Sequence, residues 1–288
     1  MRPLVALVAV TAIWGVTFVQ VKDAVEIYPL FAFLAVRYAI ATGVLGLVGA
    51  RRVRTLGRSG FVAGGVLGVL LGVGIGLQTA GLERTTVSST GFITGLYVVF
   101  TPLFGLMLFR TRVGAEVWLG VVLSVIGLGM LSGVHVGSTT GDLLVLASTS
   151  AQALQIVMVE RYANRYDAIA LTLVEMATCF LGFLVIAIAL GDLSVPRGWT
   201  VWGALIVTGV FASAFAFLIQ IWAQRRISAA RIALVFALET VWAGFFGFVL
   251  DGDRLGWLGW GGCAAILAGI VVAEPAAAGV LRRLARRP

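Results

Sequence analysis

Ten long apolar runs follow one another along the chain, separated by short segments that contain Arg, Asp, Gly or Pro. An α-helix needs about 20 apolar residues to cross the roughly 30 Å of hydrocarbon in a bilayer, and the runs are of this length. The pattern predicts helices at residues 3–21, 30–49, 61–81, 86–109, 115–133, 139–160, 167–190, 199–222, 230–250 and 256–274. We therefore predict an all-α integral membrane protein with ten transmembrane helices.

The composition leads to the same class of protein. Of the 288 residues, 60% are hydrophobic and 12% are charged, and the mean hydropathy is +1.05. One water-facing globule could not hide this much apolar surface, so the lipid bilayer must be part of the solvent. The first run contains the bulky residues Trp14 and Phe18 and is of spanning length, so we interpret it as a retained helix and not as a signal peptide.

Basic residues are distributed unevenly between the two sets of connections. With the N-terminus inside the cell, sixteen fall on the cytoplasmic face: Arg2, Arg51, Arg52, Arg54, Arg58, Arg110, Arg112, Arg161, Arg165, Arg225, Arg226, Arg231, Arg282, Arg283, Arg286 and Arg287. Four fall on the opposite face: Lys22, Arg84, Arg197 and Arg254. Because Lys and Arg gather on the cytoplasmic side, we predict that both termini are cytoplasmic, in the inner membrane of a bacterial cell. Small basic clusters between apolar runs, without a single basic stripe, argue against nucleic-acid binding.

The two halves of the chain resemble each other at an offset of 142 residues. The matched pairs include Gln78 with Gln220, Arg84 with Arg226, Trp118 with Trp260, Gly120 with Gly262 and Gly127 with Gly269. We predict a five-helix repeat in residues 1–135 and a second in residues 136–288, which ends in a basic cytoplasmic tail. Five is an odd number, so the second repeat enters the membrane from the opposite side. Inverted repeats favour alternating access around a central site near the midplane.

Small residues and one proline indicate how the helices pack. Gly64, Gly68, Gly72 and Gly76 form one stripe, against which we expect a neighbouring helix to lie, either as a fixed seam or as a sliding surface. Pro102 lies inside the fourth predicted helix and removes a backbone hydrogen bond there, so we expect a kink that is either static or a hinge.

Three ionisable residues lie at membrane depth, where they are costly and usually face a cavity or a partner. Arg37 and Glu175 lie at similar depths of the second and seventh helices, so they either form a buried ion pair or bind substrate. Glu239 lies near the middle of the ninth helix, and its counterpart in the first repeat is Tyr97. A carboxyl in a medium of low dielectric constant can bind a proton or a cationic group, so Glu239 could couple transport to protons. Alternatively, neighbouring hydroxyl groups could simply hydrogen-bond to it.

Neutral polar and aromatic side chains complete the candidate cavity. Gln78, Gln152, Gln155 and Gln220 either bind a polar solute or hold helices together. Trp14, Phe18 and Tyr97 either line an aromatic cavity or simply pack.

The residues that enzymes and metal sites require are missing from the membrane interior. The one histidine, His135, lies in a predicted loop, and Cys179 and Cys263 lie within apolar runs without metal-ligand spacing. We therefore expect no catalytic residues, no metal site and no cofactor.

Four segments together resemble one known family. AIWGVTFVQVK (12–22), GLERTTVSSTGFITGLYVVFTPLF (81–104), GDLLVLASTSAQALQIVMVERYA (141–163) and AQRRISAARIALVFALET (223–240) are similar to EamA-type members of the drug/metabolite transporter superfamily. The resemblance covers essentially the whole chain. It implies ten helices in a five-plus-five inverted duplication, a central cavity, and export of amino acids or related metabolites.

The family motifs map onto particular residues. The Trp-Gly pair of the first helix corresponds to Trp14 and Gly15, the proline of the fourth helix to Pro102, and the glutamate of the ninth helix to Glu239. The chain departs from the family pattern at three positions. Thr240 stands in place of the usual Pro, Asp253 stands in place of the usual Glu, and Glu175 stands where relatives often have Gln.

These observations favour a secondary transporter that exports small amphipathic metabolites, driven by the substrate gradient or by a proton. The competing classes are a flippase for lipid-linked or amphiphilic substrates, a channel-like permease and a membrane-embedded enzyme. The expected partners are a small-molecule substrate and the bilayer, with the protein as a monomer or a homodimer.

Overall fold

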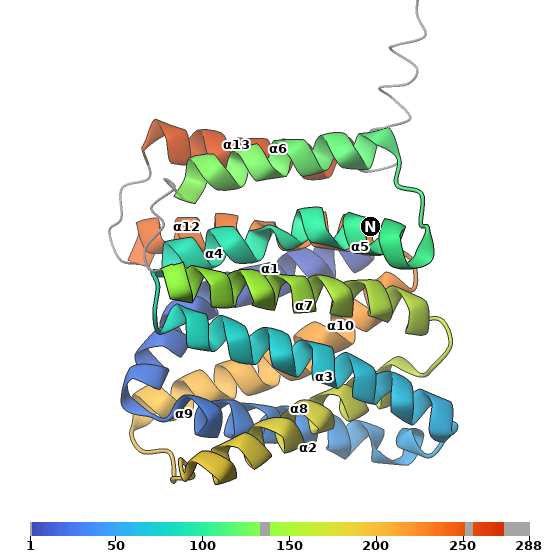
Figure 1. Cartoon of the computed structure of the whole chain (residues 1–288), viewed down its shortest axis with the longest axis vertical. Coiled ribbons are helices and arrows are strands. Elements are labelled where there is room, and N and C mark those ends of the chain that lie inside the picture. Colours follow the sequence, from blue (N-terminus) through green and yellow to red (C-terminus); the bar gives the residue numbers. More distant parts are fainter. Residues whose placement is uncertain (1, 133–138, 251–255, 274–288) are drawn as a thin grey trace, which may run out of the picture.

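The structure, a computed structural model, describes residues 2–132, 139–250 and 256–273, and every regular element in these ranges is a helix (Figure 1). The first half contains α1 (Arg2–Ile27), α2 (Leu30–Val53), α3 (Gly57–Leu82), α4 (Val87–Gly95), α5 (Tyr97–Phe109) and α6 (Ala115–Ser132). The second half contains α7 (Thr139–Tyr162), α8 (Ala168–Leu190), α9 (Trp199–Ile206), the π-helix η1 (Val207–Phe215), α10 (Ala216–Gln224), α11 (Ala229–Phe236), α12 (Leu238–Leu250) and α13 (Trp257–Ala273). The predicted repeat boundary, His135 and the basic tail lie outside the described residues.

These elements form ten spans within the described ranges, because α4 continues into α5, α9 and η1 into α10, and α11 into α12. Seven spans have at least 18 residues and enough apolar character to cross a membrane, and Ala115–Leu131 and Trp257–Ala273 are slightly shorter apolar helices. Large apolar side chains face outward along the bundle, as at Leu47, which is 89% exposed. The predicted all-α membrane fold is confirmed.

Among the helix boundaries that differ from the prediction, two differ for a simple reason. The first span was predicted to end at residue 21, but α1 continues through Lys22, Asp23 and Glu26 to Ile27. Lys and Glu are good helix formers, so the helix continues beyond the apolar run that marks its membrane-spanning part. Likewise α2 extends to Val53 through Arg51 and Arg52, whose charges favour a helix C-terminus.

Two helix pairs lie at opposite edges of the bundle, α6 with α13 and α2 with α8, and the other spans lie between them (Figure 1). Both pairs are antiparallel. In the first pair a Cβ on Gly120 would lie 2.6 Å from the carbonyl oxygen of Gly269, and one on Gly127 would lie 2.6 Å from that of Gly262. The repeat equates Gly120 with Gly262 and Gly127 with Gly269, so the two contacts exchange when the halves exchange. This is the signature of a pseudo-two-fold axis in the membrane plane.

The central spans obey the same symmetry. α1 packs against α10 and against α11 and α12 of the second half. Its counterpart α7 packs against α3 and against α4 and α5 of the first half. The halves are therefore interleaved as a five-plus-five inverted repeat, and their interface passes through the middle of the bundle.

The glycine stripe of α3 lies along α8. A Cβ on Gly64 would lie 2.7 Å from Val174 Cβ, and one on Gly68 would lie 2.5 Å from Thr178 Cβ and 2.6 Å from the Glu175 carbonyl oxygen. Farther along, Gly76 meets the ring of Phe183 and Gly72 makes an ordinary contact with Cys179. The two helices are closest around Gly64 and Gly68, where a methyl group would meet main chain or a β-branched side chain.

Candidate functional site

A central cavity of about 60 Å³ lies at the interface of the two halves. Its wall is drawn from both halves and comprises Trp14, Thr17, Phe18, Val21, Arg37, Leu71, Ile75, Gln78, Thr79, Leu82, Tyr97, Gln152, Gln155, Ile156, Phe217, Gln220, Phe236 and Glu239. Nine of the ten side chains that the sequence nominated for a cavity are in this wall. The tenth, Glu175, lies directly behind Gln155.

Tyr97 and Glu239 lie where two spans are interrupted. The fourth span breaks at Leu96, so Tyr97 is the first residue of α5, and the ninth breaks at Ala237, so Glu239 is the second residue of α12. The Tyr97 hydroxyl is 3.4 Å from Glu239 Oε2 and donates to it across the interface. The repeat relates these two residues at an offset of 142, so each half contributes one polar group at an equivalent break. At both points the linking residue keeps helical backbone angles while nearby hydrogen bonds tighten to an i→i−3 pattern, so each break is a local irregularity in a continuing span.

One wall of the cavity is aromatic. The rings of Trp14 and Phe236 are 4.8 Å apart at 69°, and those of Tyr97 and Phe236 are 6.2 Å apart at 79°, so both pairs are edge-to-face. The rings of Trp14 and Phe217 are 5.6 Å apart and tilted at 44°. Edge-to-face contacts are a preferred arrangement of aromatic rings. The result is a firm apolar surface beside the polar groups.

Gly15, the residue after Trp14, lies at a close contact between α1 and α12. A Cβ there would lie 2.7 Å from Trp242 Cβ and 2.9 Å from both Ala243 N and the Glu239 carbonyl oxygen. Its absence lets α1 approach the first turn of α12, which brings Trp14 and Glu239 to the same cavity.

The π-helix η1 positions the other charged group of the cavity. Ser213 of η1 accepts a hydrogen bond from Arg37 Nε at 2.9 Å, and the Ala212 carbonyl accepts one from Trp14 Nε1 at 2.9 Å. Gly209 allows η1 to reach α2, because a Cβ there would lie 2.9 Å from the Arg37 carbonyl oxygen. π-Helical segments frequently mark functional sites, and this one orients both Arg37 and Trp14.

A chain of amides runs from the cavity wall into α8. Gln155 Nε2 donates to Glu175 Oε1 at 2.7 Å, and Gln220 Nε2 donates to Gln155 Oε1 at 3.0 Å and to Gln224 Oε1 at 3.1 Å. The remaining cavity amides bond within their own half, Gln78 to Thr94 Oγ1 and Gln152 to Ser148 Oγ, each at 2.9 Å.

Arg37 and Glu175 do not form the buried ion pair that was one of the two sequence-based alternatives. Arg37 donates to Ser213, Glu175 accepts from Gln155, and within the described residues no ion pair joins the two. Similar depth in two helices does not fix the direction in which each side chain points around its helix, and here Arg37 lines the cavity while Glu175 lies behind its wall.

Sequence reasoning missed several wall residues. Thr17, Thr79, Phe217 and Phe236 line the cavity, and Ser213 holds Arg37. Each is an ordinary residue for an apolar helix, so no local signal separated it from lipid-facing neighbours. Conversely, Pro102 lies away from the central cavity, beside a separate hollow of about 120 Å³ near the ends of α5 and α7.

A second hollow lies outside the bundle, in an apolar groove between α3 and α8. Its lining includes Gly72, Val73, Gly76, Leu181 and Val185. The groove and the central cavity have no lining residue in common. The described part of the chain also contains no cluster of three or more His, Cys, Asp or Glu residues suited to a metal ion.

Ten spans in two inverted halves around a mixed polar and aromatic cavity define the class, which is that of membrane transporters. The chain belongs to the EamA-like transporter family, whose model matches residues 1–133 and 139–273.

Relatives agree with this family assignment, and a solved structure agrees with the fold. A protein of Archaeoglobus fulgidus named "Uncharacterized transporter" is 28% identical over 269 residues, covering 92% of this chain and 83% of the relative. "Uncharacterized transporter YoaV" of Bacillus subtilis is 21% identical, covering 86% and 88%. Human "Solute carrier family 35 member F6" is 28% identical over 128 residues, which is 41% of this chain and 34% of that protein. A solved crystal structure superposes with a TM-score of 0.77 at 20% identity, covering 97% of this chain and 98% of the other.

Proposed function

We propose that this protein exports small amphipathic metabolites, such as amino acids, by alternating access around the central cavity. The observation that supports this most is the composition of the wall, in which Arg37 and Glu239 present opposite formal charges beside an aromatic surface. An amino acid has a carboxylate for Arg37, an ammonium group for Glu239 and a side chain for the rings of Trp14 and Phe236. Arg37 and Glu239 should bind complementary groups of a solute, because a buried charge without a partner is costly.

The size of the cavity supports a mechanism in which the walls move. A volume of about 60 Å³ accommodates water but no amino acid, whereas pockets for small organic ligands are usually about 300–1,000 Å³. The inverted repeat supplies the means, because two similar halves can exchange conformations and so open one site to either face in turn.

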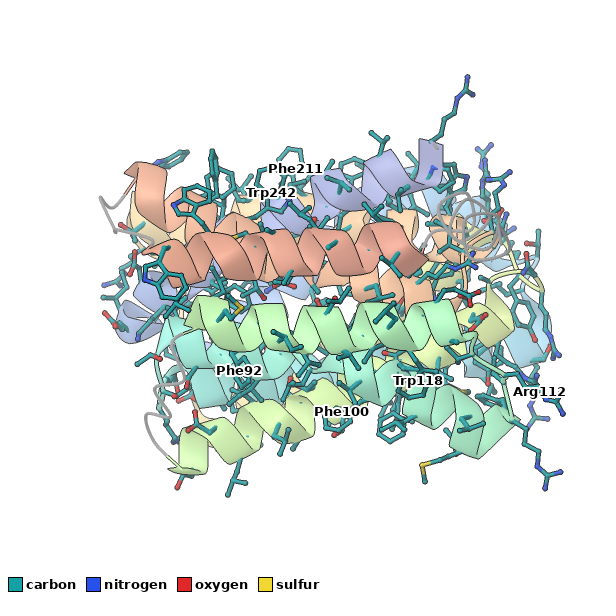
Figure 2. All side chains as sticks on the ribbon, turned by 90° about the horizontal axis from the view of Figure 1, so that it is seen from above. Phe92, Phe100, Arg112, Trp118, Phe211 and Trp242 are labelled. Atoms are coloured by element: carbon teal, nitrogen blue, oxygen red, sulfur yellow. The ribbon has the colours of Figure 1, made fainter. Side chains whose placement is uncertain are left out.

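Charge placement supports an orientation with both termini in the cytoplasm and the protein in the inner membrane of a bacterial cell. Basic residues gather at one end of the bundle, where Figure 2 shows Arg112 projecting beyond the helices. We assign the halves to residues 1–135 and 136–288, and we expect no catalytic, metal or cofactor site.

The test is flux into and out of proteoliposomes that contain the purified chain, with a panel of amino acids, sugars and amphiphilic drugs. We expect saturable flux for at least one amphipathic metabolite with a carboxylate. Arg37→Ala and Glu239→Gln should each lower that flux by about tenfold or more, since a charged hydrogen bond contributes about 1.5–3 kcal/mol. Flux equal to that of empty vesicles across the whole panel would refute the proposal.

The groove between α3 and α8 is the one feature that favours a flippase. An acyl chain could lie in it, but it shares no wall residue with the polar cavity that a head group would need. A channel-like permease makes a different prediction, which is flux that rises linearly with solute concentration.

A further inference from the structure

Glu175 is the ionisable residue that the central cavity leaves unexplained. It lies in α8, its exposed fraction is 0%, and it is not part of the cavity wall. One hydrogen bond links it to that wall, from Gln155 Nε2 to Glu175 Oε1 at 2.7 Å. The direct hydrogen-bonded link between Glu175 and the cavity is therefore the Gln155 amide.

The second carboxyl oxygen of Glu175 has no donor. Oε2 is buried and makes no hydrogen bond among the described residues. An ionised carboxyl with one bare oxygen is expensive at this depth. A neutral carboxyl fits the geometry better, because Oε1 can accept from Gln155 while Oε2 bears the hydrogen.

Few titratable groups surround Glu175. Tyr38 of α2 and Cys179 of α8 itself interact electrostatically with Glu175, and Arg37 of α2 interacts with both of these groups. The other elements packed here present groups that do not ionise: Gly68 of α3, Gln155 of α7, Ser213 of η1 and Gln220 of α10. Arg37 is thus the one nearby cation in the described part of the chain, and it faces the cavity.

We propose that Glu175 is an exchangeable proton site and that Gln155 and Arg37 transmit its state to the central cavity. With the proton bound, Gln155 and Arg37 keep the arrangement seen here, in which the guanidinium is free to meet a solute. When the proton leaves, the carboxylate attracts Arg37 and strengthens the hydrogen bond from Gln155. The ion pair between Arg37 and Glu175 then belongs to the proton-free state.

This coupling rests on the proposed transport of carboxylate-bearing solutes. Proton binding releases Arg37 for the solute, so the proton and the solute carboxylate should each favour binding of the other. Solute affinity should accordingly rise as pH falls through the titration of Glu175.

The proton site is tested without any solute, by infrared difference spectra of the purified full chain between about pH 5 and pH 9, a range in which a buried carboxyl can titrate. We expect a protonated-carboxyl band that disappears as pH rises, is lost in Glu175→Gln and is retained in Glu239→Gln. In Arg37→Gln the band should persist to higher pH, because the counter-charge of the carboxylate is gone. A titrating band from which Glu175→Gln removes no component, or a Glu175 component that does not change with pH, overturns the proposal.

Two further arms keep the test decisive. If Glu175→Gln does not fold, as judged by thermal unfolding, Gln155→Leu takes its place: removing the donor should shift the frequency of the band, and an unchanged frequency contradicts the assignment. In proteoliposomes, flux with the same pH dependence in wild type and Glu175→Gln would overturn the coupling but leave the transporter. The absence of any flux would instead refute the proposed function and leave the infrared result intact.

Discussion

At the scale of single residues, the glycines of α3 differ more than their sequence spacing implies. The four-residue stripe treats Gly64, Gly68, Gly72 and Gly76 as equivalent, yet a Cβ would strike the main chain of α8 at Gly68 and make an ordinary contact at Gly72. Gly65 lies outside the stripe, and no described atom is within 4 Å of its Cβ position. Sequence periodicity identified the face of the helix, but not the point of closest approach.

This difference gives a matched pair of variants. Gly68→Ala should lower the free energy of unfolding by about 1–3 kcal/mol, since overpacking a tight contact forces the two helices apart. Gly65→Ala should leave stability unchanged or raise it slightly, because alanine favours the helix. Thermal unfolding of both variants in the same detergent is the measurement. Equal midpoints for the two would contradict the close packing of α3 on α8.

The Gly15 contact leads to a second prediction for a single residue. In Gly15→Ala the new methyl group would meet main-chain atoms at Glu239 and Ala243, so α1 and α12 must separate. We expect flux to fall by about tenfold or more, because separations of about 1 Å at a binding site can cost that much. Gly43→Ala is the control, since its Cβ position has no described atom within 4 Å. Transport that is unaffected in Gly15→Ala would separate the Trp14–Gly15 pair from the site.

At the scale of elements, the interruptions of three spans are what the apolar pattern could not reveal. A continuous apolar run looks the same whether it forms one helix, as in α8, or two, as in α11 and α12. Partners from distant parts of the sequence meet at these points, since Tyr97 donates to Glu239 and Trp14 donates to the Ala212 carbonyl in η1. The sequence predicted a kink in the fourth span from Pro102, which lies inside α5, six residues after Leu96.

The second half shows that proline is not required for the break. α11 and α12 separate at Ala237 without any proline, within one residue of the position equivalent to the break before Tyr97. We therefore expect Pro102→Ala to retain the break and to keep flux within about twofold of wild type, while adding the missing backbone hydrogen bond. Kinetics in proteoliposomes decide between this and the hinge role. A large loss of maximal flux, with the protein still folded, would support a hinge at Pro102.

At the scale of the whole molecule, the sequence predicted the architecture well because the bilayer imposes simple rules. The lengths of the apolar runs define the spans, and the odd number of helices in each half gives the two halves opposite orientations in the membrane. The cavity residues could be predicted for the same reason, because a polar side chain such as Gln155 within an apolar run is expected to face the protein interior and not the lipid. The direction in which each side chain points around its helix axis could not be predicted, and this direction separates Arg37 from Glu175.

The topology makes its own prediction. Reporter tags at the N-terminus and the C-terminus should both be found on the cytoplasmic side, because the basic ends of α2, α5, α7 and α10 share one face of the bundle. A tag inserted between α1 and α2 should be found on the other side. Termini on different sides would contradict an even number of spans.

The most direct test of transport through the central cavity compares two tryptophan substitutions on one helix. Ile75 of α3 lines the cavity, whereas Val73, two residues away, lines the outer groove and is 49% exposed. We predict that Ile75→Trp fills the cavity and abolishes saturable flux in proteoliposomes while the protein remains folded. Val73→Trp should transport as the wild type does. The reverse result, with flux blocked by Val73→Trp and retained in Ile75→Trp, would place the route along the lipid-facing groove and contradict the central site.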